Sequence, residues 1–345
     1  MALINLGPEK SLSLSAGNAK TSFRHQKPMA EKGMIWARLG KDRRKFADIT
    51  CICEDFSVSA RVRAALQRDF GQDSAVIFID RDFIAAAVFD GYNRGGTLLS
   101  ETLADKLIET LAERREDIIA GKMHPGILLR DATEAAFSRR TKLAKYLAEN
   151  PGGATAVLAV IKNGYWQAAK VSDSALFVIE GDGGVKRPME DTTYLPRQVD
   201  ARKAPKIIGA QLDQYIENRH RVTGTICLGS GEPDDMILSH TNGSLDKGET
   251  IILATDGVTK NLKIKIDAGS DKKKITDASG CEDLADMVRG KKGAEGISDA
   301  VHSTITARVQ QRIVDVLDRT VIDKKKGAAL CVSDDDSALV VISRH

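Results

Sequence analysis

Two aspartate-glycine pairs of this sequence follow short apolar runs. Asp90-Gly91 ends the run Ala85–Phe89, and Asp256-Gly257 ends the run Thr250–Ala254. Runs of this kind, rich in Val, Ile or Ala, predict β-strands. Asp-Gly after a strand is an ordinary turn signal. It also places a carboxylate at the strand end, beside a glycine that lets a backbone carbonyl approach an ion. For either pair alone, both interpretations stay open.

Two further acidic positions have the opposite polarity, because they precede apolar runs. Asp48 stands before Ile49–Cys53, and Asp335, in the triplet 334–336, stands before Ala338–Ile342. By register, either neighbour of Asp335 in the triplet can take its place. In an antiparallel sheet the end of one strand lies beside the start of the next, so all four positions can meet along one edge.

Such a cluster has a specific chemistry. Neighbouring carboxylates repel one another and raise each other's pKa unless a cation compensates. Mg²⁺ and Mn²⁺ prefer oxygen ligands and keep several bound waters. The pattern therefore predicts a site for divalent cations.

The composition is that of a soluble globular protein. The 345 residues are 42% hydrophobic and 29% charged, and no apolar run approaches the roughly 18–20 residues of a membrane helix. A formal charge of +3 is too small to indicate nucleic-acid binding, and residues 1–20 lack a signal-peptide pattern. We expect a monomer in the cytoplasm or nucleus that binds neither nucleic acid nor membrane.

Predicted strands and helices do not alternate regularly along the chain. Apolar residues recur every four positions between Leu98 and Ile119, which predicts a helix, and Glu134–Leu147 is similar. Two later helices are predicted at Cys281–Arg289 and 297–317. Because strict β-α alternation is absent, the order favours a layered α+β fold with antiparallel sheets over a doubly wound parallel sheet.

Five segments, in order, resemble motifs of the metal-dependent type 2C serine/threonine protein phosphatases. They are Ala-Val-Phe-Asp-Gly-Tyr-Asn-Arg-Gly-Gly (87–96), Gly-Gly-Ala-Thr-Ala (152–156), Lys-Val-Ser-Asp-Ser-Ala-Leu (170–176), Leu-Ala-Thr-Asp-Gly-Val (253–258) and Asp-Asp-Ser-Ala-Leu-Val-Val-Ile (335–342). The resemblance implies a four-layer α-β-β-α sandwich with two central antiparallel sheets flanked by helices. It implies one catalytic domain over residues 31–345, with insertions near 56–80, 186–221 and 260–278, after a flexible arm at 1–30.

The resemblance also implies a centre with two ions, Mg²⁺ or Mn²⁺. Asp90 would bridge both ions, and the Gly91 carbonyl and Asp48 would each contact one. Asp256 and Asp335 would complete the ligand set. Hydroxide between the ions would hydrolyse phosphoserine and phosphothreonine in phosphoprotein substrates, without a phosphoenzyme.

The first metal aspartate is assigned from the spacing of one segment. Residues 40–48 match the family's Gly-x-x-Arg-x-x-Asn-Glu/Gln-Asp segment, which implies that Arg43 binds phosphate and Asp48 binds an ion. A rival is Asp55, which follows Glu54 but lacks an arginine at the matching offset. Asp48 is preferred, and Asp55 stays open.

Three positions depart from the family pattern. Tyr92 replaces a histidine that follows Asp-Gly, so the leaving group would take its proton from water or from Tyr92. Ser172 replaces the glycine before Asp173, which matches a ligand of a third ion. Lys260 stands where many relatives carry an aspartate for that ion, and its charge could replace the ion. These departures favour an alternative function, a catalytically weak or inactive relative that acts as a regulatory protein-binding module.

Overall fold

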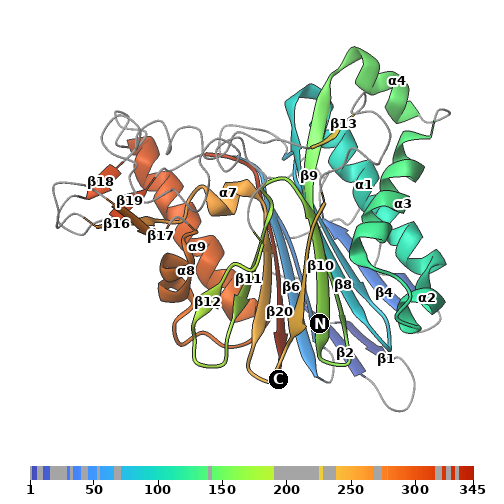
Figure 1. Ribbon diagram of the computed structural model, residues 1–345, viewed down its shortest axis with the longest axis horizontal. Helices are drawn as coiled ribbons and strands as arrows, with labels where there is room; N and C mark the ends of the chain where they lie inside the picture. Colours follow the sequence, from blue (N-terminus) through green and yellow to red (C-terminus); the bar gives the residue numbers. More distant parts are fainter. Residues whose placement is uncertain are drawn as a thin grey trace.

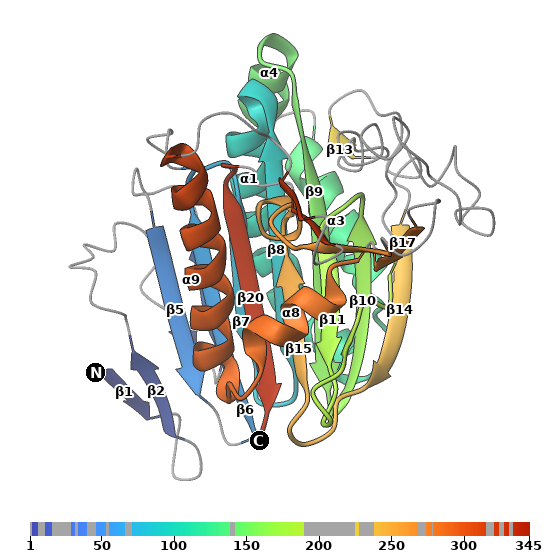
Figure 2. The ribbon, with the colours of Figure 1, turned by 90° about the vertical axis from the view of Figure 1, so that its left-hand side faces the viewer.

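The chain folds into two antiparallel sheets packed face to face, with helices on both outer faces (Figures 1 and 2). The computed structural model describes residues 2–5, 11–15, 29–31, 34–39, 46–52, 55–65, 71–138, 142–189, 225–227, 238–267, 274–277, 279–314, 321–323, 328–330 and 334–345.

The first sheet contains strands from both ends of the chain. Its order is β1 (Ala2–Asn5), β2 (Ser11–Ser15), β5 (Phe46–Ile52), β6 (Phe56–Arg63), β20 (Ser337–Arg344), β15 (Thr250–Ala254), β11 (Ala175–Ile179) and β12 (Val185–Lys186). The segment expected to be a flexible arm thus contributes a hairpin, whose second strand pairs with β5. Strand β6 lies between β5 and β20, so this part of the range 56–80 is an inner strand and not an insertion.

The second sheet is also antiparallel throughout. Its order is β14 (Leu238–Ser244), β10 (Tyr165–Val171), β9 (Gly152–Lys162), β8 (Ile84–Tyr92), β7 (Ser74–Ile79), β4 (Met34–Leu39) and β3 (Met29–Glu31), with β13 (Ile226–Cys227) on β9. Strand β7 is an inner strand as well, so residues 74–79 of the range 56–80 are not an insertion either, whereas residues 66–70 lie outside the described residues. Strands β9 and β10 are joined through Asn163 and Gly164, whose φ values of 52° and 78° suit a tight hairpin turn.

Helices cover the outer face of each sheet. The second sheet is covered by α1 (Asn93–Glu113), α2 (Arg115–Ile119), α3 (Pro125–Phe137) and α4 (Lys142–Glu149), and the first by α8 (Cys281–Val288) and α9 (Gly293–Val314). The short helix α7 (Asp256–Thr259) follows β15. A small separate sheet has the order β17 (Lys274–Asp277), β16 (Ile264–Asp267), β19 (Ala328–Leu330) and β18 (Val321–Asp323). It includes part of the insertion expected near 260–278. Most of the insertion expected at 186–221 lies outside the described residues.

The predicted helices differ from the observed ones at their ends. The helix predicted from Leu98 starts earlier, at Asn93, and is interrupted at Arg114, where the backbone reaches φ −90° and ψ 10°. The helix predicted over Glu134–Leu147 is two helices, because Ser138 leaves the helical region with ψ 132°.

The core has three apolar layers, and strand β8 separates two of them. Its residues Ile84, Ala86 and Val88 pack between the sheets. The alternate residues Ala85, Ala87 and Phe89 pack under α1 and α3. This alternation follows from the two-residue period of a strand. A third layer lies between the first sheet and α8 and α9. The predicted α+β sandwich of four layers is therefore confirmed.

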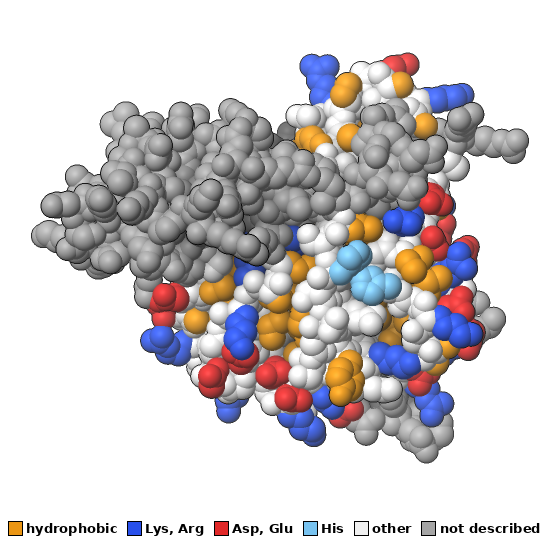
Figure 3. Space-filling view, in the orientation of Figure 1, with side chains coloured by type: hydrophobic (Ala, Val, Ile, Leu, Met, Phe, Trp, Pro, Cys, Tyr) orange, Lys and Arg blue, Asp and Glu red, His pale blue; other side chains and the backbone are white. Residues whose placement is uncertain are grey.

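None of the helices in the described ranges is both long enough and apolar enough to cross a membrane. On the face shown in Figure 3, acidic and basic side chains are interspersed with hydrophobic ones.

Candidate functional site

Two aspartates of the second sheet lie at the same end of the sandwich. Asp73 directly precedes β7, and Asp90 lies near the end of β8. These strands are antiparallel neighbours with Ser74 opposite Phe89, so the start of one lies beside the end of the other. The sheet therefore presents two carboxylates along one edge.

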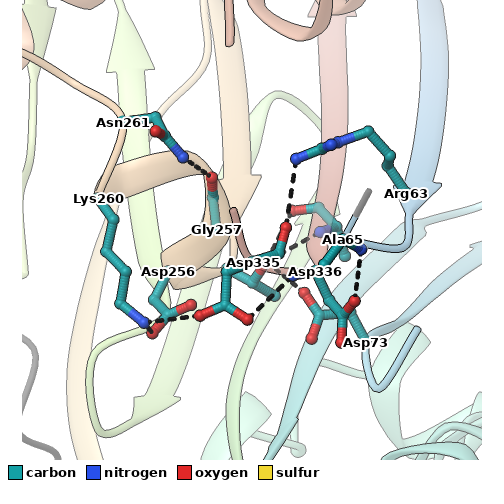
Figure 4. A network of polar contacts seen from close by, with 11 residues as sticks. Arg63, Ala65, Asp73, Asp256, Gly257, Lys260, Asn261, Asp335 and Asp336 are labelled. Atoms are coloured by element: carbon teal, nitrogen blue, oxygen red, sulfur yellow. Dashed lines mark hydrogen bonds and ion pairs between the residues drawn. The ribbon is translucent and has the colours of Figure 1, made fainter. Parts of the chain in front are cut away.

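Two aspartates of the first sheet complete the group. Asp256 follows β15 and begins α7, whereas Asp335 precedes β20. These strands are also antiparallel neighbours. The charge of Asp256 raises the pKa of Asp90, which links the aspartates of the two sheets electrostatically. Figure 4 shows Asp256, Asp335 and Asp73 close together.

Asp73 is the member that the sequence prediction missed. It is 3% exposed, and its Oδ2 atom accepts a hydrogen bond of 2.7 Å from Thr255 Oγ1. Thr255 directly precedes Asp256, so this bond fixes the two aspartates relative to each other. A signal was present, because Gly71-Gln72-Asp73 before an apolar run has the Gln-Asp letters of the family segment. Arg68 precedes Asp73 by the same five residues that separate Arg43 from Asp48.

Asp48, the predicted first ligand, does not join the group. It lies inside β5 opposite Arg61 of β6, and Arg61 lies opposite Leu339 of β20. Two strand spacings of about 4.8 Å each separate β5 from β20. Its neighbours Ala47 and Ile49 pack between the sheets, so the Asp48 side chain points to the opposite face. The ligand role predicted for Asp48 is wrong.

The rival ligand Asp55 lies at the opposite end of the first sheet. It precedes β6, whose first residue Phe56 pairs with Arg344 at the end of β20. Its ligand role is excluded for this reason. Arg43 lies outside the described residues, and without Asp48 the spacing that supported it is lost. Arg68 is also outside them.

The glycines after Asp90 and Asp256 allow a close approach of other backbone segments. A side chain at Gly91 would overlap the carbonyl oxygens of Gln72 and Gly96. A side chain at Gly257 would overlap the carbonyl oxygen of Asp336. Each glycine therefore brings its aspartate toward another acidic segment, Gln72-Asp73 in one case and Asp335-Asp336 in the other.

The side chains of the acidic triplet have different partners. Asp335 Oδ2 lies 2.9 Å from Lys260 Nζ, beside Asp256. Asp336 accepts hydrogen bonds from two backbone groups, Ala65 N at 2.7 Å and Gln72 N at 2.9 Å. Asp334 lies 3.9 Å from the guanidinium of Arg63. The structure thus places Asp335 with the other aspartates, while Asp336 holds the two backbone segments that flank residues 66–70.

Lys260 lies between Asp256 and Asp335. Its backbone N–H donates to the Asp256 carbonyl at 2.7 Å, which places both side chains on one face of the α7 turn. Its Nζ atom forms ion pairs with Oδ2 of Asp256 and Oδ2 of Asp335 (Figure 4). Burial acts to lower the pKa of Lys260, but the two carboxylates outweigh it and raise that pKa above its ordinary value.

The remaining electrostatics favour a cation at the other two aspartates. Burial raises the pKa of Asp90, and the charges of Asp256 and Asp73 raise it further. Burial and the charge of Asp336 raise the pKa of Asp73, against the hydrogen bond from Thr255. A divalent cation would relieve this repulsion, and carboxylate oxygens are its preferred ligands.

The four aspartates Asp73, Asp90, Asp256 and Asp335 do not form a complete metal site by themselves. Across the described ranges, no three Asp, Glu, His or Cys side chains are arranged to hold a metal ion as they stand. Lys260 lies between Asp256 and Asp335, two members of the group. The chemistry of the donors therefore fits a divalent cation at Asp73 and Asp90, while an ammonium lies at the other pair.

Asp173, the predicted third-ion ligand, lies near this group. It is 2% exposed in the turn between β10 and β11, and its charge contributes to the raised pKa of Asp90. Ser172 before it has φ 71°, in the left-handed region that favours glycine. The buried Ser172 hydroxyl has no hydrogen-bond partner among the residues described.

Tyr92 supplies a hydroxyl beside Asp90-Gly91. Its Oη atom lies 2.5 Å from Thr225 Oγ1, and its ring packs where a side chain at Gly153 would stand. Burial raises the pKa of Tyr92. The phenol therefore keeps its proton at neutral pH.

Comparisons with known proteins assign the fold. No protein-family model matches the sequence, and no curated protein matches it. Among solved structures, the chain is similar to the Mycobacterium tuberculosis serine/threonine phosphatase PstP/Ppp, with 16% identity, TM-score 0.52 and coverage of 84% of this chain and 99% of that one. PppA, described as a key regulatory component of T6SS in Pseudomonas aeruginosa, has 15% identity, TM-score 0.53 and coverage of 85% and 99%.

A third similar structure was solved with metal bound. It is the catalytic domain of serine/threonine protein phosphatase PstP in complex with two manganese ions, with 15% identity, TM-score 0.50 and coverage of 84% and 98%. The chain thus has the fold of the type 2C serine/threonine phosphatases, as its five sequence motifs predict.

Proposed function

We propose that this protein hydrolyses phosphoserine and phosphothreonine in phosphoproteins, in a reaction that requires a divalent cation. The observation that carries the proposal is the convergence of Asp73, Asp90, Asp256 and Asp335 from both sheets at one end of the sandwich. The shared fold and the five ordered motifs support the same reaction.

In this proposal the aspartates hold the cation, with Asp73 and Asp90 as its main ligands and the Gly91 carbonyl beside them. A bound divalent cation would lower the pKa of water and neutralise charge on the phosphate. Thr255 orients Asp73 through its hydrogen bond. Water is the nucleophile, so no phosphoenzyme forms.

Arg68 takes over the phosphate-binding role that the spacing first suggested for Arg43. Its offset of five residues from Asp73 supports this assignment. A planar guanidinium binds two phosphate oxygens at once. We expect Arg68→Ala to raise KM for a phosphopeptide at least tenfold and Arg43→Ala to leave KM unchanged. Equal effects of the two substitutions would contradict the assignment.

Tyr92 is proposed to protonate the leaving group. An alkoxide leaving group, as from phosphoserine, needs a proton, whereas p-nitrophenolate is stable without one. We expect Tyr92→Phe to lower kcat for a phosphoserine peptide and to leave kcat for p-nitrophenyl phosphate unchanged. Equal losses on both substrates would assign Tyr92 a structural role.

The main test compares Asp73→Asn with Asp48→Asn. With Mn²⁺ or Mg²⁺, the wild type and Asp48→Asn should hydrolyse a phosphothreonine peptide, and EDTA should abolish the reaction. Asp73→Asn should lose at least two orders of magnitude in kcat/KM. Wild-type protein no faster than Asp73→Asn at saturating metal would overturn the proposed function.

The second candidate function is a regulatory binding module with weak or no activity. The ion pairs of Lys260 with Asp256 and Asp335 favour it, because the lysine lies between two expected metal ligands. The same assay separates the two functions. A module would show no metal-dependent hydrolysis in the wild type while remaining folded.

A further inference from the structure

The ammonium group of Lys260 lies in a position where a cation is expected. Nζ is 2.9 Å from Asp335 Oδ2 and forms a second ion pair with Asp256 Oδ2. The lysine charge also acts to lower the pKa of Asp90. One ammonium therefore lies between two carboxylates that neighbouring strands supply, Asp256 after β15 and Asp335 before β20.

The lysine is held in this place by its own segment. Its backbone N–H closes the α7 turn onto the Asp256 carbonyl at 2.7 Å. The next residue, Asn261, donates from Nδ2 to the Gly257 carbonyl at 2.7 Å and is fully buried. The Lys260 side chain is 16% exposed, so it is part of the packed site and not a free surface chain.

An ammonium and a metal ion cannot occupy this space together. A magnesium ion bound to both Oδ2 atoms would lie about 2.0–2.1 Å from each. The Nζ atom already lies between those two oxygens (Figure 4). Two cations so close would repel strongly in a site with little water.

We propose that Lys260 is a built-in cation that takes the place of one divalent ion between Asp256 and Asp335. The protein then binds one divalent ion fewer than it would with an uncharged residue at position 260. That remaining ion lies at Asp73 and Asp90. This inference rests on the proposed function, because it assumes that the aspartates bind divalent cations.

The test counts bound ions instead of measuring turnover. The full-length wild type, Lys260→Met and Lys263→Met are titrated with Mn²⁺ by calorimetry, and free Mn²⁺ is followed by electron paramagnetic resonance. Lys263 is an exposed lysine close by in sequence and serves as the matched control. We expect Lys260→Met to bind one Mn²⁺ ion more than the wild type, and Lys263→Met to bind the same number as the wild type. No gain in a folded Lys260→Met protein overturns the inference.

A second variant, Lys260→Gln, keeps the test decisive if Lys260→Met does not fold. Lys260→Gln removes the charge but keeps an amide that can donate to one carboxylate, so it should bind the additional ion even if Lys260→Met does not fold without metal. Equal stoichiometry in the wild type and Lys260→Gln would overturn the inference. The proposed function is judged separately, by whether the wild type hydrolyses a phosphopeptide with metal. Hydrolysis together with equal ion counts would reject the role of Lys260 alone.

Discussion

Replacing Asp336 by asparagine tests whether this carboxylate holds two backbone segments together. Oδ1 accepts from Ala65 N and Oδ2 from Gln72 N. Asparagine has a single acceptor oxygen, so either orientation turns its NH₂ group toward one of these N–H donors. One buried donor is then left facing another donor.

Two opposing energies set the change in the free energy of unfolding that Asp336→Asn causes. Leaving a buried N–H without a partner costs about 1–3 kcal/mol. Against this, the charge of Asp336 repels Asp73, and the asparagine removes that repulsion. Asp336→Asn therefore loses the full free energy of this hydrogen bond only in a protein in which residue 73 carries no charge. We expect Asp336→Asn to lower the free energy of unfolding by about 1–3 kcal/mol in an Asp73→Asn background, and by less in the wild type.

The assay is urea unfolding of the four proteins of this double-mutant cycle, in EDTA. Asp55→Asn serves as the control, because Asp55 is exposed at the opposite end of the first sheet, and it should change stability by less than about 0.5 kcal/mol. A cost below about 0.5 kcal/mol for Asp336→Asn in the Asp73→Asn background would refute the reasoning. A larger cost in the wild type than in that background would refute the proposed repulsion.

Three further predictions concern the same end of the sandwich. Ser172→Gly should raise the free energy of unfolding by about 1 kcal/mol, because it relieves a left-handed backbone without breaking a described hydrogen bond; an unchanged urea midpoint would contradict this. Gly257→Ala should cost more than about 2 kcal/mol, since the added carbon overlaps the Asp336 carbonyl oxygen; a loss below about 1 kcal/mol would disprove the close approach. Asp73 and Asp90 have raised pKa values in the folded state, so the folded state binds more protons than the unfolded state. Stability in EDTA should therefore fall as the pH rises from about 4 through these raised values, and this fall should be smaller in Asp73→Asn; an identical pH profile of urea midpoints would contradict the assignment.

Most of the fold was predictable because its strands have clear apolar runs. Strands β8, β9 and β15 are buried on both faces and have continuous apolar sequences. Strand β6 was missed, although its sequence alternates. Val58, Ala60 and Val62 face the core, and polar residues stand between them. A two-residue alternation is a weaker signal of a strand than a continuous apolar run.

The site was predictable in part, for a related reason. Asp90 and Asp256 carry the local Asp-Gly signal, which follows from close backbone contacts at the glycines. Asp48 matched a spacing, but its position inside β5 points its side chain to the wrong face. Asp73 has no comparable local signal apart from the Gln-Asp pair that it forms with Gln72. Its place among the site aspartates follows from the hydrogen bond that it accepts from Thr255, which is far away in sequence.

The sequence by itself determined the type of chemistry at this site. Carboxylates at strand ends, with glycines beside them, indicated a cation site before any strand was placed. Only the tertiary structure decided which carboxylates take part, because strand order and register bring together residues as distant in sequence as Asp73 and Asp335. It also placed Lys260 between Asp256 and Asp335. In the sequence, a lysine one turn after an aspartate is an ordinary helical pair. The role proposed for Lys260 depends on Asp335 as well, which lies before a different strand, β20.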